Sequence, residues 1–174
     1  MSKGVVQIAW NDDVALLTLN RPERRNAVDL ESLELIQEIQ VEAVSREIRA
    51  LVLTGAPPAF CAGADLAGVR EEVFHEALNK VLRGFTQMPC VTIAAIDGPA
   101  LGAGAQLVVV CDVRVATKES VIGVPAAKLG LVVNHWTIER IVREFSWPVA
   151  RNMLLTATNY SAEDLHRMGS IHRL

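Results

Sequence analysis

The segment IDGPALGAGAQ, residues 96–106, follows one short apolar run and opens into another. Its glycines and alanines are typical of a tight turn that leads directly into a helix, and they let a ligand approach the main chain closely. The first N–H groups of a helix have no intrahelical acceptor and carry partial positive charge. We therefore expect this helix start to bind an oxygen atom that carries negative charge.

A second loop of small residues, FCAGAD at residues 60–65, has the same setting because it follows a strand-like run at residues 50–55. It could offer another backbone N–H to the same oxygen, and two such donors form an oxyanion hole. The alternative is that both loops only let a helix pack closely on a strand, as segments of glycine and alanine often do.

The composition indicates one globular domain over residues 1–174. Of the 174 residues, 51% are hydrophobic, and the formal net charge is only -3, which allows a sizeable core. Basic runs interleaved with aromatic residues are absent, so a nucleic-acid surface is not expected. Because no apolar run reaches the roughly 18 residues of a membrane span and no secretory signal is recognisable, we expect a cytoplasmic protein.

Cysteine and histidine usage argues against a metal centre. Cys61, Cys90 and Cys111 are odd in number and lack Cys-x-x-Cys spacing, so we interpret them as buried thiols rather than as a disulfide framework or a zinc site. The four histidines are scattered without ligand spacing, and no metal site is predicted.

Strand and helix patterns alternate along the chain, which favours an α/β fold with helices on the faces of a sheet. The runs at 50–54 and 91–96 are apolar except for one threonine each and indicate strands buried on both faces. Strands are expected at 5–10, 14–19, 50–54, 91–96 and 112–117, and helices at 30–47, 67–87, 136–145, 148–155 and 161–168. Asp29 and Ser161 are plausible N-caps.

Four segments in this order resemble the crotonase (enoyl-CoA hydratase/isomerase) superfamily: LNRP at 19–22 followed by Asn26-Ala27, FCAGAD at 60–65, DGPALGAGAQ at 97–106 and CDVR at 111–114. The resemblance extends over essentially the whole chain. The resemblance implies a crotonase-like superhelix of ββα turns and a homo-oligomer, either a trimer or a dimer of trimers. It also implies that acyl-CoA is the ligand or substrate, with no additional cofactor.

Carried over by position, the resemblance assigns the two oxyanion-hole donors to the amides of Ala64 and Ala103. Arg24 and Arg25 would meet the CoA phosphates by charge, with solvated surface as the equal alternative. Asp65 would brace its loop rather than act in catalysis. The full set of residues expected at the CoA and acyl site is Arg24, Arg25, Ala27, Ala62, Gly63, Ala64, Asp65, Leu66, Ala103, Gln106, Lys128, Leu131 and Trp136.

The sequence departs from the family where hydration is catalysed. Relatives that hydrate enoyl-CoA use two glutamates, and the corresponding positions here are Gln106 and Ala126. Neither side chain can accept a proton. General acid/base catalysis supplies about 10²- to 10⁴-fold in rate, so most hydratase activity should be lost while thioester binding is retained. Lys128, Asn134 and His135 are the candidate replacement bases. A lone histidine beside a helix start is more often a cap or a surface residue, and we favour that interpretation for His135.

We therefore expect an enoyl-CoA hydratase-like protein of acyl-CoA metabolism that binds thioesters with little or no hydratase activity, as in paralogues that lack both glutamates. The alternative is an active hydratase or isomerase that uses another base. Family members continue past the segment at 169–174 with helices that complete the trimer. We expect this chain either to be naturally short or to be part of a longer one, with apolar surface uncovered on its last helices.

Overall fold

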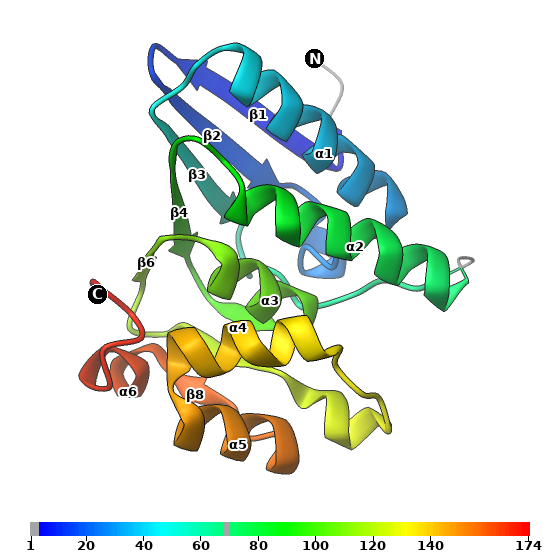
Figure 1. The fold of residues 1–174 in the computed structure, drawn as a ribbon, viewed down its shortest axis with the longest axis vertical. Helices are drawn as coiled ribbons and strands as arrows, with labels where there is room; N and C mark the ends of the chain where they lie inside the picture. The colour runs from blue at the N-terminus through cyan, green and yellow to red at the C-terminus, as the bar shows by residue number, and fades with distance from the viewer. Residues whose placement is uncertain (1–3, 68–69) are drawn as a thin grey trace.

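A computed structural model describes residues 4–67 and 70–174 of the chain (Figure 1). Its larger sheet has five strands in the order β1-β2-β3-β4-β6. β1 and β2 pair antiparallel as a hairpin, and the remaining neighbours are parallel. The strands are β1 (Val6–Asn11), β2 (Val14–Leu19), β3 (Ala50–Gly55), β4 (Val91–Ile96) and β6 (Val113–Ala116).

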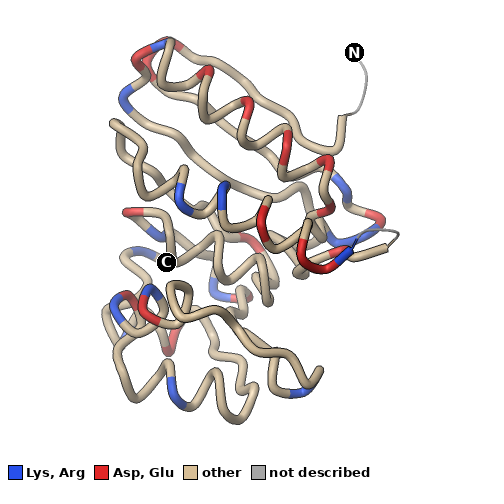
Figure 2. The backbone as a smooth tube through the Cα atoms, turned by 45° about the vertical axis from the view of Figure 1, so that its right-hand side comes forward, with Lys and Arg blue, Asp and Glu red and all other residues tan. Residues whose placement is uncertain are grey.

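Two long helices, α1 (Leu30–Ser45) and α2 (Glu71–Thr86), cover one face of this sheet (Figure 1). The Asp29 side chain accepts a hydrogen bond from the Ser32 amide and so caps α1 as predicted. The inward side of α1 is mainly apolar, whereas acidic residues recur along its solvent side (Figure 2). This is the amphipathic pattern that places a helix on a sheet.

A smaller sheet, β5-β7-β8, lies in the other half of the molecule together with the remaining helices (Figure 1). Every residue of α3 except Gln106 is buried. The elements of this half are β5 (Pro99–Leu101), α3 (Ala103–Val110), β7 (Val121–Gly123), α4 (His135–Phe145), α5 (Trp147–Thr156), β8 (Tyr160–Ser161) and α6 (Ala162–Arg167). Short 3-10 helices form at Pro22–Arg24 and Pro125–Leu129.

The element order repeats a strand-strand-helix unit: β1-β2-α1, β4-β5-α3 and β6-β7-α4. In the unit that contains β3 and α2, isolated bridges of Cys61 with Ala100 and of Ala64 with Val28 stand where the others have a second strand. This repetition confirms the expected superhelix of ββα turns. The short strands β5 and β7 escaped prediction because three residues are too few to show a periodic pattern.

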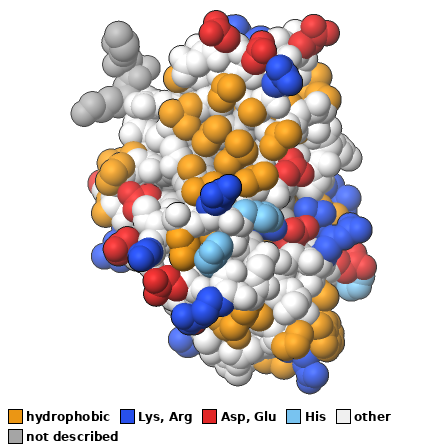
Figure 3. Space-filling model, turned by 90° about the vertical axis from the view of Figure 1, so that its left-hand side faces the viewer, with side chains coloured by type: hydrophobic (Ala, Val, Ile, Leu, Met, Phe, Trp, Pro, Cys, Tyr) orange, Lys and Arg blue, Asp and Glu red, His pale blue; other side chains and the backbone are white. Residues whose placement is uncertain are grey.

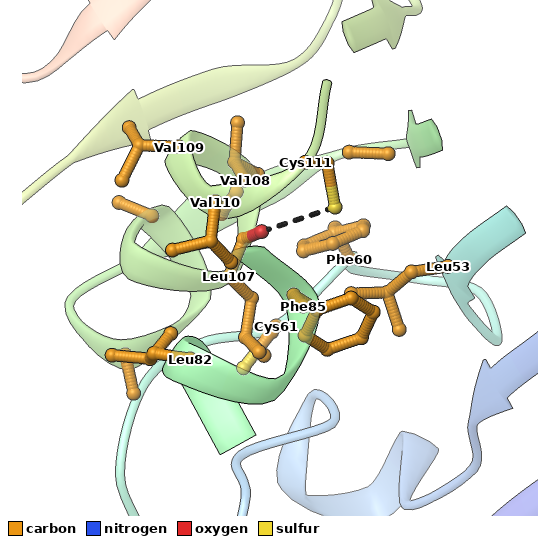
Figure 4. Packing of buried hydrophobic residues seen from close by; sticks show 14 of the residues in the cluster. Leu53, Phe60, Cys61, Leu82, Phe85, Leu107, Val108, Val109, Val110 and Cys111 are labelled. Carbon is orange, nitrogen blue, oxygen red and sulfur yellow. Dashed lines mark hydrogen bonds between the residues drawn. The ribbon is translucent and has the colours of Figure 1, made fainter. Parts of the chain in front are cut away.

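One continuous core joins the two halves. Phe60, Phe85 and Leu107 are fully buried where the loop after β3 meets α2 and α3 (Figure 4). Cys61 and Cys111 are buried in the same region, as predicted, but Cys90 is only partly buried. Cys90 immediately precedes the first residue of β4, so it lies where that strand begins. The interpretation of all three thiols as buried was therefore wrong for Cys90.

The expectation that β3 and β4 are buried on both faces was also wrong. Burial alternates along both strands, and Val91 is 48% exposed. Exposed apolar side chains on β2, β4 and β6 belong to the sheet face turned away from α1 and α2, and hydrophobic side chains gather over part of the surface in Figure 3. A run of apolar residues shows only that a strand can be buried, because tertiary packing decides which face is covered.

The last helices leave large apolar side chains uncovered, as expected. Trp147, Leu155 and Met168 are 57%, 71% and 54% exposed. Within residues 4–67 and 70–174, no helix combines the length and apolar character that a bilayer span requires. The same residues contain no group of three or more His, Cys, Asp or Glu side chains placed to hold a metal ion.

Candidate acyl-thioester site

A pocket of about 350 Å³ lies where the two glycine- and alanine-rich segments meet. The loop after β3 contributes Ala62, Gly63 and Ala64 to its lining, and the start of α3 contributes Gly102 and Ala103. Most of the remaining wall is apolar, from α2 and from the segment at 124–134. The size and the mixed lining are typical of a site for a small organic ligand.

The backbone amides of Ala64 and Ala103 are both available at this pocket. Ala103 is the first residue of α3, so its N–H has no acceptor within the helix. Ala64 lies between two residues whose backbone already bonds to Val28: the Gly63 carbonyl accepts from the Val28 amide, and the Asp65 amide donates to the Val28 carbonyl. Among the described residues, neither the Ala64 N–H nor the Ala103 N–H has a hydrogen-bond acceptor. The chain thus supplies two free donors to one cavity.

Backbone hydrogen bonds hold the two segments at a fixed separation. The Cys61 amide donates to the Pro99 carbonyl over 3.0 Å, and the Leu101 amide donates to the Cys61 carbonyl over 2.9 Å. Gly102 then turns the chain into α3 with φ of 55°, a conformation that glycine adopts without the strain of a side chain. The relative position of the two amides is therefore a property of the fold.

Arg21, which is not among the lining residues, braces the first of these loops. Its guanidinium donates to Asp65 Oδ2 over 2.9 Å and to the Ala27 carbonyl over 2.6 Å, and it also pairs with Asp29. The hydrogen bond from Arg21 holds the pKa of Asp65 below its ordinary value, with a smaller contribution from the Ala67 amide. Asp65 is thus an ionised structural group rather than a proton donor.

Gln106 and Ala126 both line the pocket. The Gln106 carboxamide oxygen accepts a hydrogen bond from the hydroxyl of Thr137 on α4 over 3.2 Å. Among the described lining residues no aspartate or glutamate occurs, and the titratable side chain that is present is His75 of α2. The cavity therefore offers hydrogen-bond donors without a carboxylate base.

A model of the enoyl-CoA hydratase/isomerase family matches residues 9–174. The chain belongs to this family. It is 35% identical over 171 residues to a protein of Mycobacterium tuberculosis named "Probable enoyl-CoA hydratase echA6", an alignment that covers 98% of this chain and 70% of the relative.

Solved structures agree with this assignment. An enoyl-CoA hydratase/carnithine racemase from Magnetospirillum magneticum superposes with a TM-score of 0.90 at 31% identity, over 99% of this chain and 68% of that one. An enoyl-CoA hydratase from Mycobacterium smegmatis gives a TM-score of 0.90 at 30% identity, over 98% and 69% of the two chains. The crotonase fold predicted from the four sequence segments is thereby confirmed.

In this member of the enoyl-CoA hydratase/isomerase family, part of the expected site comes together at the pocket. The residues brought together there are Ala62, Gly63, Ala64, Leu66, Ala103, Gln106, Ala126 and Leu131. Arg24 and Arg25 are exposed beside the same loop, and Ala27 receives the Arg21 hydrogen bond. These three, like Asp65, lie outside the pocket lining.

Of the expected site residues after position 126, Leu131 and Asn134 line the pocket, whereas Lys128, His135 and Trp136 do not. Lys128 is exposed outside the lining, and His135 points to solvent, where it pairs with Glu139. Trp136 lies under the guanidinium of Arg83 at 5.0 Å, in a separate groove between the end of α2, α4 and the start of α5. Neither Lys128 nor His135 is therefore placed to act as a base in this pocket.

Sequence reasoning missed the contribution of α2. Phe74, His75, Leu78 and Asn79 all line the pocket. The strong amphipathic pattern of residues 71–86 indicated which side of this helix faces inward. It could not indicate which turn faces the cavity and which faces the core, because that depends on how α2 packs against α3.

Proposed function

We propose that this protein binds acyl-CoA thioesters through the backbone amides of Ala64 and Ala103, and that it hydrates enoyl-CoA weakly or not at all. The observation that carries the proposal is a pocket lined by two amides without internal acceptors and, in the described part of the chain, by no carboxylate. A thioester carbonyl is the acceptor that such a donor pair fits, since both donors can approach one oxygen.

The expected loss of hydration follows from the chemistry of the addition. Water adds across the C2–C3 double bond, and a base must take a proton from the attacking water while an acid delivers one to C2. Gln106 and Ala126 stand where the family resemblance places the two glutamates of hydrating relatives. An amide and a methyl group cannot exchange protons near neutral pH.

Binding should be measured by calorimetry with hexanoyl-CoA, and the Ala103 donor can be tested directly. Ala103→Pro removes one N–H at the first position of a helix, where proline is tolerated. We expect hexanoyl-CoA to bind about threefold to tenfold more weakly to this variant. His135→Pro is the matched control, because His135 is the exposed first residue of α4 and lies outside the pocket lining. Undetectable binding of hexanoyl-CoA to the unsubstituted protein would refute the proposal.

Turnover should be measured with crotonyl-CoA and trans-2-hexenoyl-CoA against a glutamate-bearing relative. Comparable turnover would show that the protein is an active hydratase with another base, and His75→Ala would then identify or exclude the titratable side chain in the lining. The double substitution Gln106→Glu and Ala126→Glu should raise hydration if carboxylates alone are missing. An unchanged rate would mean that the pocket geometry also differs from that of a hydratase.

A cytoplasmic location and assembly into trimers or pairs of trimers are part of the same proposal. The exposed apolar residues on α5 and after α6 support association. Light scattering tests it, and a monodisperse monomer at micromolar concentration would contradict it.

A further inference from the structure

The carboxamide groups around the pocket are arranged so that their oxygens already accept hydrogen bonds from the protein. Gln106 Oε1 accepts from Thr137 Oγ1 over 3.2 Å. Asn134 Oδ1 accepts from the Thr137 amide over 2.9 Å, and Asn79 Oδ1 accepts from Asn134 Nδ2 over 2.9 Å. Gln106, Asn79 and Asn134 all line the pocket. The hydrogen-bonding groups that these side chains still offer to a ligand are therefore mainly N–H donors.

Gln106 is held through its carboxamide oxygen by a buried hydroxyl. Thr137 is 1% exposed, and its amide donates to the Asn134 side chain that caps α4, so the position of Thr137 is fixed by burial and by this cap. Because the Thr137 hydroxyl donates to the carboxamide oxygen of Gln106, the Gln106 nitrogen is left to face other partners. Within residues 4–67 and 70–174, that nitrogen donates no hydrogen bond. An N–H donor is thus available at a defined place in a mainly apolar cavity.

The place of this donor relative to Ala103 follows from helix geometry. Gln106 is three residues after Ala103 in α3, so the two lie on the same side of the helix, about 4.5 Å apart along its axis. If the amides of Ala64 and Ala103 hold a thioester oxygen, the Gln106 side chain is long enough to reach the first carbons of the acyl chain. A second oxygen near C3 would lie within its range.

We propose that the pocket prefers 3-oxoacyl thioesters over saturated ones of the same length, with Gln106 as the donor to the C3 carbonyl oxygen. The inference rests on the proposed thioester site and names its ligand class. A ketone oxygen only accepts hydrogen bonds, which matches a wall with free donors. A 3-hydroxyl group also carries a proton, and the nearby carboxamide oxygens already accept protein hydrogen bonds. Phe74, Leu78, Leu131 and Val132 suit the apolar remainder of the chain.

The first test compares four CoA thioesters of one chain length on the unsubstituted protein by calorimetry: hexanoyl-, trans-2-hexenoyl-, 3-hydroxyhexanoyl- and 3-oxohexanoyl-CoA. We expect 3-oxohexanoyl-CoA to bind about threefold to tenfold more tightly than hexanoyl-CoA, the effect of one hydrogen bond in a partly dry site.

Equal affinities for 3-oxohexanoyl-CoA and hexanoyl-CoA would overturn this preference while leaving thioester binding intact. Tight binding of the 3-hydroxy compound, equal to that of the 3-oxo compound, would overturn the preference for a carbonyl. No binding of any of the four would overturn both proposals.

The second test removes the donor and its support separately. Gln106→Leu should abolish the preference by weakening 3-oxohexanoyl-CoA binding alone, whereas the same change at Gln37 on α1, outside the pocket lining, should preserve it. Thr137 is a positioning residue in this scheme. Thr137→Val should reduce the preference because the carboxamide is free to turn, and Thr137→Ser should restore it. Retention of the preference in both Gln106→Leu and Thr137→Val would assign the selectivity to another group.

Discussion

Gly104 lies directly against the main chain of Cys61. A Cβ atom at Gly104 would come within 2.3 Å of the Cys61 carbonyl oxygen, which is shorter than any ordinary contact of a side chain. This oxygen also accepts the Leu101 amide. One carbonyl group thus fixes the distance between the loop that carries Ala64 and the helix that begins at Ala103. The glycine at position 104 is required by this close approach, since its neighbour is backbone and cannot move aside.

Gly104→Ala should therefore damage both stability and binding. We expect a loss of about 3 kcal/mol in the free energy of unfolding from overpacking against backbone, measured by urea denaturation. At temperatures where the variant is folded, hexanoyl-CoA should bind more weakly because the two amides are displaced from each other. Gly130→Ala is the control: nothing lies within 4 Å of its Cβ position, so only its positive φ of 67° is strained and the loss should be about 1 kcal/mol. Equal losses would show that the contact with Cys61 does not matter.

The fold was largely predictable because its elements are long enough to show a period or carry a clear cap. The helix at 30–47 appears as Leu30–Ser45 with the predicted Asp29 cap, and the runs at 14–19 and 91–96 are strands with those bounds. The covered face of the sheet was not predictable. Val52 and Ile93 would suit a buried strand on either face, and only the position of α1 and α2 on one side leaves them partly exposed.

The positions that line the pocket were partly predictable from sequence, whereas the contacts between their side chains were not. Glycine and alanine at 62–64 and 102–105 mark places where a ligand can reach backbone amides, and both segments do line one pocket. The hydrogen bond between Gln106 and Thr137 joins residues 31 apart in sequence, and the lining from Asn79 comes from a helix before both. Such contacts are set by helix packing, for which a sequence pattern gives no distance.

Among the charged residues that the structure describes, Arg114 should be the one whose substitution lowers the free energy of unfolding most. It is 3% exposed and donates to the carbonyls of Ser170 and Cys111 and to Glu144. Arg114→Leu leaves these acceptors without a donor in a buried setting, so we expect a loss of about 3–5 kcal/mol in the free energy of unfolding. Urea titration measures it. Arg167→Ala removes an exposed pair with Asp164 and should cost far less, because exposed ion pairs contribute little. A similar cost for both substitutions would show that the buried network contributes little.

The three cysteines should differ in their reaction with an alkylating agent. Burial raises the pKa of Cys111 to about 12 and that of Cys61 to about 11, and both thiols lie inside the core shown in Figure 4. The thiolate is the reactive form, so neither should be modified in the folded protein near pH 8. Cys90 is only partly buried, although desolvation and the nearby Asp112 carboxylate raise its pKa as well. Mass spectrometry after iodoacetamide treatment should find modification at Cys90 first, and at all three sites in urea. Early modification of Cys61 would contradict the packing of its loop.

The contact between Arg21 and Asp65 should make the free energy of unfolding depend on pH in the acid range. Folding lowers the pKa of Asp65 below its ordinary value of 3.8, chiefly through the hydrogen bond from Arg21. The ionised form is thus favoured by the folded state, and its contribution is complete above that ordinary value and is lost as the pH falls through the lower folded value. Asp65→Asn cannot titrate. The difference in unfolding free energy between the unsubstituted protein and this variant should therefore be largest at neutral pH and shrink toward pH 2.

In an Arg21→Met background the same Asp65→Asn change should give a difference that varies much less with pH, because the guanidinium that lowers the pKa is gone. If the pH dependence is the same in both backgrounds, Arg21 is not its source and the brace beside the Ala64 loop is not electrostatic.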